Sequence, residues 1–254
     1  MTESMHESNS AVAAIPGLAP AAREVLTDLI EQAVKCFDDD LSSILLYGSA
    51  AEGQLRPTSD INLLLVLLQF PRERIDPLRE ILRRARALAN VKVMFLLDSE
   101  LQSASEAFAV KFDDIIRRHL VLYGDDPLRD LDITREARIV RLRQVLLNLA
   151  IRLRERYAMA SLREEQLILV LAEHAAPLRA AAATILEIQE DPAPSGKEAL
   201  AVLAPALEVP EWKETLANLS LARETRKLSP RVAAETLFQL IAMTDSLRRL
   251  VERL

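Results

Sequence analysis

The sequence has 254 residues, of which 50% are hydrophobic and only 4% aromatic, with five glycines. This composition favours long packed helices over a sandwich of short strands, and the chain is long enough for a sizeable core. The net charge of −6 and the isoelectric point of about 5.3 exclude a strongly basic protein. Because nucleic-acid binders usually carry a basic balance or stripe, bulk affinity for DNA or RNA is disfavoured.

Few features bear on cellular location. Cys36 is the single cysteine and cannot form an intrachain disulfide, so nothing ties the protein to an oxidising compartment. The longest apolar run, from Ile61 to Phe70, is about half as long as a membrane-spanning helix needs to be. The polar N-terminus lacks the basic flank and apolar region of a signal peptide. We therefore expect a cytoplasmic protein that does not bind a membrane.

The first half of the chain alternates helical and strand patterns, after a lead at residues 1–17 that is expected to be disordered. Apolar positions at helical spacing predict helices, and near-continuous apolar runs bounded by turn residues predict buried strands. In chain order these are a helix at Ala21–Phe37, strands at Leu41–Tyr47 and Ile61–Leu68, a helix at Pro71–Ala89, a strand at Val91–Leu97, a helix at Phe108–His119 and a strand at Leu120–Tyr123. Together they predict one domain of helices and strands at residues 18–130.

The second half, residues 131–254, is expected to be an all-helical domain. A long helix is predicted from Ile133 to Ala160, with an apolar seam spaced by alternating threes and fours at Ile139, Leu142, Leu146, Leu149 and Leu153. Such a seam suits a bundle partner or a second subunit, so a homodimer through this domain is predicted. A further helix is expected at 162–190, where Pro177 should bend or interrupt it. A linker is expected at 191–196, followed by helices at 197–207, 211–227 and 230–254.

One stretch combines glycine, serine and aspartate around two predicted strands. Taken separately, a Gly-Ser pair after a strand and a Ser-Asp pair before the next are common and carry no functional signal. Their joint spacing, in a strand-turn-helix-strand context, is what supports a functional interpretation. The signature residues are Gly48, Ser49, Gly53, Ser59, Asp60 and Asn62.

This spacing resembles the polymerase β nucleotidyltransferase superfamily, and most closely its small bacterial members related to aminoglycoside nucleotidyltransferases. The family pattern is Gly-Ser, a spaced glycine, and Ser-Asp-x-Asp on the next strand. The segment from Phe112 to Leu128 is also similar to the end of that domain, so the resemblance covers about residues 20–130. It implies an α+β fold, in which a mixed sheet with helices is followed by an all-α helical bundle domain.

The resemblance implies that the glycines and serines of the signature form a phosphate cradle. Gly48 lets the backbone turn sharply and approach a ligand closely, because it has no Cβ. Ser49 would lie at a helix start, where unpaired N–H groups and the helix dipole favour phosphate oxygens. Gly53 and Ser59 would complete the binding of a nucleoside triphosphate.

The carboxylates of the family metal site are incomplete in this chain. Asp60 would bind Mg²⁺ and act as the main catalytic residue. The second family aspartate is replaced by Asn62, which lies on the same face of the strand and is a weak second catalytic residue, since its oxygen brings no charge. A third acid is expected on the neighbouring strand, which offers Lys92, and the nearest acid, Asp98, lies beyond the strand's end. Two of three charges are therefore missing or displaced, which predicts reduced or absent activity.

Two functions of different classes follow from the resemblance. The first is an enzyme that transfers a nucleoside monophosphate from ATP or another nucleoside triphosphate to a hydroxyl of a small-molecule or protein acceptor, with Mg²⁺ as cofactor. The second is a catalytically degenerate protein of the same fold that binds a nucleotide or a partner. A third, one half of a toxin–antitoxin-like pair, is disfavoured because the helical tail lacks the arginine and closely following histidine of the ribonuclease partners.

Other charged residues have plainer explanations. Arginines cluster at residues 79–86 and 135–156, where helix faces paired with nearby acids are expected; the alternative is a local site for phosphate or an acidic partner. Asp113 and Asp114 are expected on a solvated helix face, and His174 on a helix surface. The three histidines show no zinc-binding spacing.

Overall fold

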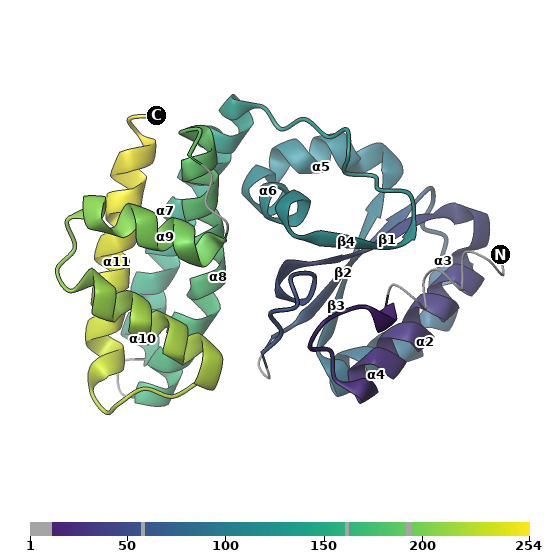
Figure 1. Ribbon diagram of the computed structural model, residues 1–254, viewed down its shortest axis with the longest axis horizontal. Coiled ribbons are helices and arrows are strands. Elements are labelled where there is room, and N and C mark those ends of the chain that lie inside the picture. The colour runs from purple at the N-terminus through teal and green to yellow at the C-terminus, as the bar shows by residue number, and fades with distance from the viewer. Residues whose placement is uncertain (1–11, 57–58, 161–162, 192–194) are drawn as a thin grey trace. The chain divides into compact units, whose positions relative to one another are not determined.

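The computed structural model describes residues 12–56, 59–160, 163–191 and 195–254, and the chain forms two compact units. The first unit contains Met1–Ser105 and Ile115–Asp132 and includes the β-sheet. The second contains Glu106–Asp114 and Ile133–Leu254, and its described elements are helices (Figure 1).

The first unit is organised around a four-stranded sheet with the strand order β3-β2-β1-β4. The strands are β1 (Leu41–Tyr47), β2 (Ile61–Leu67), β3 (Val91–Leu97) and β4 (His119–Gly124). β1 pairs antiparallel with both β2 and β4, whereas β2 and β3 are parallel. The sheet is therefore mixed, which confirms the predicted α+β class. Each predicted strand agrees with the observed one to within one residue at either end.

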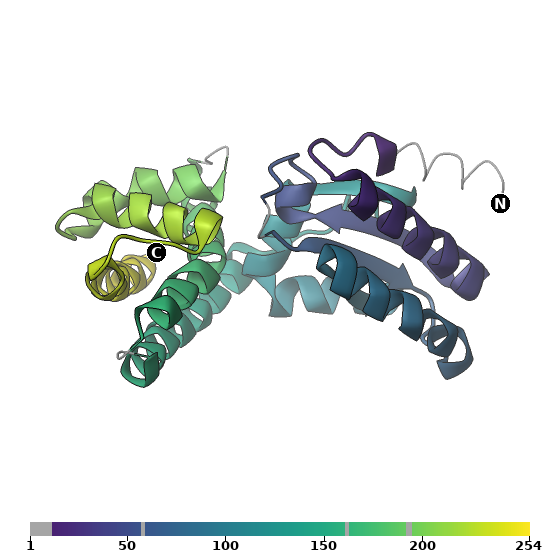
Figure 2. The same cartoon turned by 90° about the horizontal axis from the view of Figure 1, so that it is seen from below.

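The described helices before β4 include α2 (Pro20–Phe37), α3 (Arg72–Ile75), α4 (Arg79–Ala89), α5 (Leu101–Ala107) and α6 (Ala109–Arg117). Of these, α2 and α4 pack against strands of the sheet, whereas residues 109–114 of α6 belong to the helical unit. α2 and α4 lie side by side on one face of the sheet (Figures 1 and 2). Alternate residues of β2, beginning with Ile61 and Leu63, are buried in the same core as these two helices. Because strand side chains alternate, Asn62 points to the opposite face of the sheet.

Part of the predicted disordered lead belongs to the core. Residues 1–11 lie outside the described residues, but Val12, Ile15 and Leu18 are 0%, 1% and 6% exposed, in one cluster with α2 and the sheet. The prediction of disorder is therefore wrong for residues 12–17. Burial of three apolar side chains spaced three apart offsets the entropy lost when the segment is ordered.

Five described helices of eight residues or more lie wholly within the helical unit. They are α7 (Arg135–Ala160), α8 (Glu164–Ile188), α9 (Gly196–Leu203), α10 (Trp212–Thr225) and α11 (Val232–Val251). α8 is central, because α7, α9, α10 and α11 all contact it. Pro177 lies inside α8 without ending it, so the predicted interruption is wrong. Apolar packing of α8 against several neighbours offsets the hydrogen bond that the proline cannot donate.

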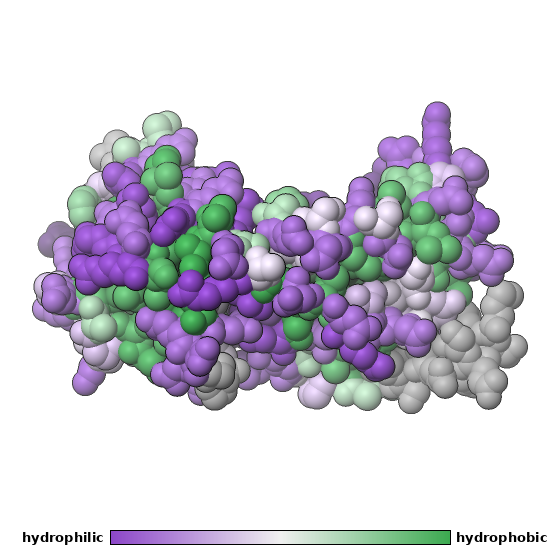
Figure 3. Space-filling view, turned by 90° about the horizontal axis from the view of Figure 1, so that it is seen from above, coloured by the Kyte–Doolittle hydropathy of each residue, from purple (hydrophilic) through white to green (hydrophobic). Residues whose placement is uncertain are grey.

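The apolar seam of α7 is used within the chain. Its residues Ile139, Leu142, Leu146, Leu149 and Leu153 are each 8% exposed or less and belong to the core of the helical unit. The seam packs against other helices of the same chain, since α7 contacts α8 and α11. It therefore no longer supports the prediction of a homodimer. On the molecular face shown in Figure 3, apolar residues form patches separated by hydrophilic side chains.

α8 is also, among the described helices, the one long and apolar enough to cross a membrane by length and composition alone. However, 72% of its most apolar 18-residue window is buried inside the protein. A central helix of a bundle needs this apolar character on most of its sides, so packing within the helical unit accounts for the composition.

Candidate functional site

Three adjacent strands bring the signature residues to one end of the sheet. Gly48 directly follows β1, whereas Asn62 and Lys92 are the second residues of β2 and β3. In the observed register Tyr47 lies opposite Asn62, and Asn62 lies beside Lys92. Because β1 is antiparallel to β2 while β3 is parallel to it, the end of β1 and the starts of β2 and β3 meet at the same edge.

Gly48 forms the sharp turn at the end of β1. Its φ of +81° lies in the left-handed region, where a side chain is costly. Its N–H donates to the carbonyl oxygen of Arg118 at 2.8 Å, and the Arg118 guanidinium pairs with Glu52 on the following loop at 3.1 Å. A Cβ at position 48 would lie 3.7 Å from Nδ2 of Asn62. The turn is thus held directly beside the start of β2.

Both carboxylate oxygens of Asp60 are bound by other side chains of this chain. Oδ2 accepts a hydrogen bond from Nζ of Lys92 at 2.6 Å, and Oδ1 accepts one from the amide of Asn90. The side chains of Asp60 and Lys92 are 35% and 51% exposed, so the ion pair lies at the surface. Where the family resemblance calls for an acid, the structure therefore has a positive charge in contact with the aspartate.

Asn90 was not among the predicted site residues. It ends α4 in the left-handed conformation, with φ 50° and ψ 37°, and its carbonyl oxygen accepts a hydrogen bond from the N–H of Ile61 at 3.3 Å. An asparagine between a helix and a strand is a sequence signal for such a cap. Only the pairing of β2 with β3, however, shows that its side chain reaches Asp60.

The loop between β1 and β2 contains the other predicted cradle residues. Ser49 belongs to a 3-10 helix of three residues, a single turn, and no α-helix begins there as the prediction required. A helix dipole needs several aligned peptide units, which this turn does not have. The hydroxyl of Ser59 accepts a hydrogen bond from the N–H of Arg56 at 3.1 Å. A Cβ on Gly53 would lie 2.9 Å from Cβ of Pro16, so this glycine allows the N-terminal segment to pack closely.

Comparison with solved structures identifies this architecture. The chain is similar to spectinomycin adenyltransferase from Enterococcus faecialis, in a crystal structure with ATP and spectinomycin. The TM-score is 0.61, and the match covers 88% of this chain and 98% of that chain. This chain has a nucleotidyltransferase-type fold. The sequence identity of 14% is too low for the comparison to show more than the fold.

A shorter sequence similarity agrees with the nucleotidyltransferase fold. Over 52 residues, or 20% of its length, the chain is 38% identical to a protein of Methanocaldococcus jannaschii that is named provisionally as a protein adenylyltransferase. The match spans 35% of that curated relative, about a third of its length. No family model matches the chain. Together the two similarities confirm the predicted resemblance to the nucleotidyltransferase superfamily.

The nucleotidyltransferase fold implies Mg²⁺, but the residues at this site do not fit it. Mg²⁺ prefers octahedral oxygen ligands that include carboxylates. Within the described ranges, no group of three or more His, Cys, Asp or Glu side chains is placed to hold a metal ion. Asp60 offers one carboxylate, and Lys92 and Asn90 already bind both of its oxygens. A cation here would have to displace the Lys92 ammonium and then stay beside it.

Two other candidate groups are structural. The side chain of Asp113 is 1% exposed and binds Nε of Arg138 through both oxygens, at 3.0 and 3.1 Å. The predicted solvated position is wrong because this acid is buried within the helical unit. His174 is likewise buried at 8% exposure, and its Nδ1 lies 2.8 Å from the carbonyl oxygen of Val170. Burial lowers the pKa of this histidine.

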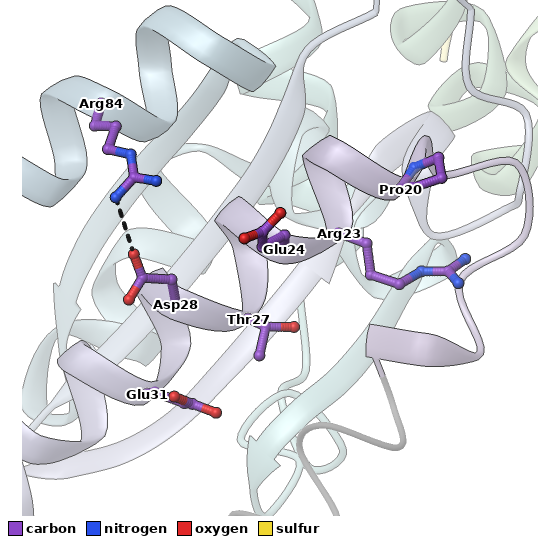
Figure 4. Close-up of a pocket in the computed structure, with 7 residues that line it drawn as sticks. All are labelled: Pro20, Arg23, Glu24, Thr27, Asp28, Glu31 and Arg84. Atoms are coloured by element: carbon purple, nitrogen blue, oxygen red, sulfur yellow. Dashed lines mark ion pairs between the residues drawn. The ribbon is translucent and has the colours of Figure 1, made fainter.

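Three arginines of α4, at positions 79, 83 and 84, are paired with nearby acids. Arg83 pairs with Glu80, and Arg84 reaches Asp28 of α2 at 3.5 Å. The same surface carries an open pocket, shown in Figure 4, whose charged lining residues are Arg23, Glu24, Asp28, Glu31 and Arg84. The acids there outnumber the arginines, and none of the predicted site residues lines the pocket. A paired and solvated helix face therefore explains this arginine cluster better than a phosphate site does.

Proposed function

We propose that this chain binds a nucleoside triphosphate, with ATP as the first candidate, at the sheet edge where Gly48, Asp60 and Lys92 meet. We further propose that it transfers nucleotidyl groups weakly or not at all. The observation that carries the proposal is that Lys92 and Asn90 bind both oxygens of Asp60. Nucleotidyl transfer by metal ions needs carboxylates that coordinate them, and here the remaining carboxylate is already neutralised.

Three features of the site support a nucleotide as its ligand. Nδ2 of Asn62 lies beside the Gly48 turn and is a donor that a phosphate oxygen can accept from. The Lys92 side chain is half exposed, and lysine is a common partner of phosphate groups. The fold is shared with an adenyltransferase whose crystal structure contains ATP.

Calorimetry with the full chain tests nucleotide binding. ATP, GTP and adenosine are titrated separately. ATP is expected to bind at least about tenfold more tightly than adenosine, because the phosphates make the main contacts. Equal or absent binding of ATP and adenosine would contradict the proposal.

Turnover is tested with α-labelled ATP and either Mg²⁺ or Mn²⁺. Transfer by the wild type is expected to be no greater than transfer by the Asp60→Ala variant. Asp76→Ala is the matched control, because Asp76 pairs with Arg72 at 3.0 Å on an exposed helix. Release of pyrophosphate that requires Asp60 but not Asp76 would show that the site is catalytic.

Active transfer is the second candidate, and the two similarities favour it. Both similar proteins are named as adenylyl- or adenyltransferases, one of them towards spectinomycin and the other towards proteins. By analogy, this chain would move AMP from ATP to a hydroxyl of a small molecule or a protein. Spectinomycin and the proteins of a cell lysate are therefore the first acceptors to offer. A labelled product that disappears in Asp60→Ala would support this candidate over the first.

A further inference from the structure

The two departures from the family signature change the charge of the site in the same direction. Three carboxylates would give a site a charge of −3, which repels phosphates until metal ions neutralise it. In this chain the charges of Asp60 and Lys92 cancel, and Asn62 contributes none. A polyanion can therefore approach the site without a divalent ion.

We propose that the Lys92 ammonium takes the place of the divalent cation, so that the site binds the phosphates of a nucleotide directly, without Mg²⁺. The inference rests on the proposed function, since it describes how the same site holds its nucleotide. It follows from the misfit between Mg²⁺ and the residues present, and it assigns a role to a lysine where the family resemblance calls for an acid.

Lys92 is placed to contact a ligand as well as Asp60. An ammonium has three N–H donors, and the Asp60 carboxylate uses one of them at 2.6 Å. The side chain is 51% exposed, which leaves room for phosphate oxygens. Lys92 also lies beside Asn62 in the strand register, and Nδ2 of Asn62 lies 3.7 Å from the Cβ position of the buried Gly48. Lys92 and Asn62 thus present an ammonium and an amide at the end of the sheet where the glycine turn lies.

Asp60 becomes a positioning residue in this arrangement. Asn90 binds Oδ1 and Lys92 binds Oδ2, so the carboxylate holds the lysine ammonium next to the start of β2. A metal ligand and a positioning residue differ in what their loss does. Replacing Asp60 with asparagine removes a negative charge and leaves the Lys92 charge uncompensated, while the amide oxygen can still accept the Lys92 hydrogen bond and keep the ammonium in place. Phosphate binding should then be retained or become tighter, whereas a metal-dependent site would lose it.

The experiment is calorimetry of the full chain with ATP and with inorganic tripolyphosphate, in EDTA and again in excess Mg²⁺. The dissociation constant for ATP in EDTA is expected to equal the value in Mg²⁺ within about threefold, or to be lower. Tripolyphosphate, which lacks the base and the sugar, should show the same insensitivity to Mg²⁺.

Variants separate the role of Lys92 from a general effect of charge. Lys92→Ala is expected to weaken ATP binding in EDTA at least about tenfold, and Lys92→Arg to retain it within about threefold. Asp60→Asn should bind ATP in EDTA no more weakly than the wild type. Lys35→Ala, at an exposed lysine on α2, is the matched control and should leave binding unchanged. Circular dichroism confirms that each variant is folded.

Each outcome distinguishes this inference from the proposed function. Binding of ATP only in Mg²⁺ would overturn the inference and leave the proposed function standing. Binding of tripolyphosphate but not ATP in EDTA would support the inference and reject the nucleotide. No binding of either compound would reject both. An Asp60→Asn variant that no longer binds ATP would also overturn the inference, because it would show that the carboxylate contributes to binding the phosphates.

Discussion

Introducing the two missing acids tests directly whether their absence is the reason that the residues of the site do not suit Mg²⁺. A double variant, Asn62→Asp with Lys92→Glu, retains Asp60 and adds two acids. The summed charge of residues 60, 62 and 92 then changes from zero to −3. A divalent ion about 4 Å from one carboxylate gains roughly 2 kcal/mol in water, so three carboxylates offer roughly 6 kcal/mol. Mutual repulsion of the carboxylates and screening by salt reduce this gain, and we take about half of it, roughly 3 kcal/mol, as the expected net value.

A gain of about 3 kcal/mol corresponds to Mg²⁺ binding more than about a hundredfold tighter than in the wild type. Calorimetry measures the affinity directly. Mg²⁺ at about a hundred times its dissociation constant should also stabilise the double variant by about 2.7 kcal/mol, which thermal unfolding detects. Asn62→Asp alone should show little of this gain, because the Lys92 ammonium stays 2.6 Å from the Asp60 carboxylate.

The matched control is Arg72→Glu, which makes the same charge change as Lys92→Glu on an exposed helix away from the site. It should leave Mg²⁺ affinity unchanged. Equal Mg²⁺ affinity in the wild type and the double variant would refute the reasoning, because the missing charges would then not be what keeps the metal from binding.

Three further predictions concern the scaffold. Gly124→Ala should lower the free energy of unfolding by about 2–5 kcal/mol in urea titrations, because φ is +73° and the new Cβ would lie 2.1 Å from the Ser42 carbonyl oxygen. Asp113→Asn should cost about 3 kcal/mol in the same assay, since Arg138 loses its buried carboxylate. Burial lowers the pKa of His174 in the folded protein. The neutral histidine therefore contributes fully to the free energy of unfolding above about pH 6.5, and this contribution is lost as the pH falls below that value. Melting temperatures between about pH 7.5 and 5 measure the loss.

Each of these predictions has a control. Gly17→Ala has a similar φ of +72° but meets only the Gly53 carbonyl oxygen at 3.6 Å, so it should cost only about 1–2 kcal/mol. Asp245→Asn breaks a more exposed pair with Arg248 and should cost less than about 1 kcal/mol. His174→Gln should flatten the acid side of the melting curve. A Gly124 variant as stable as the Gly17 variant, or a histidine variant with an unchanged pH dependence, would contradict the corresponding argument.

Local patterns explain why the strands could be predicted from the sequence. β1 and β2 are runs of apolar residues bounded by turn residues, and such a run is buried as a strand wherever it finds a partner. Burial of the remaining segments depends on distant partners. His174 and Asp113 are polar residues on amphipathic helices, and only the packing of the helical unit decides that they lie inside it. Val12 and Ile15 look like part of a polar lead until α2 and the sheet provide a core for them.

The amino acids themselves determined the chemistry available to the site: a glycine turn, one aspartate, and an asparagine and a lysine at positions where acids were expected. Residue types are local facts, and no fold can restore a missing carboxylate. Tertiary structure alone decided that Lys92 and Asn90 bind Asp60. These residues lie 32 and 30 positions from the aspartate. They meet it only because β2 and β3 pair in parallel in one register, and strand order and register depend on contacts between distant segments, which no short stretch of sequence specifies.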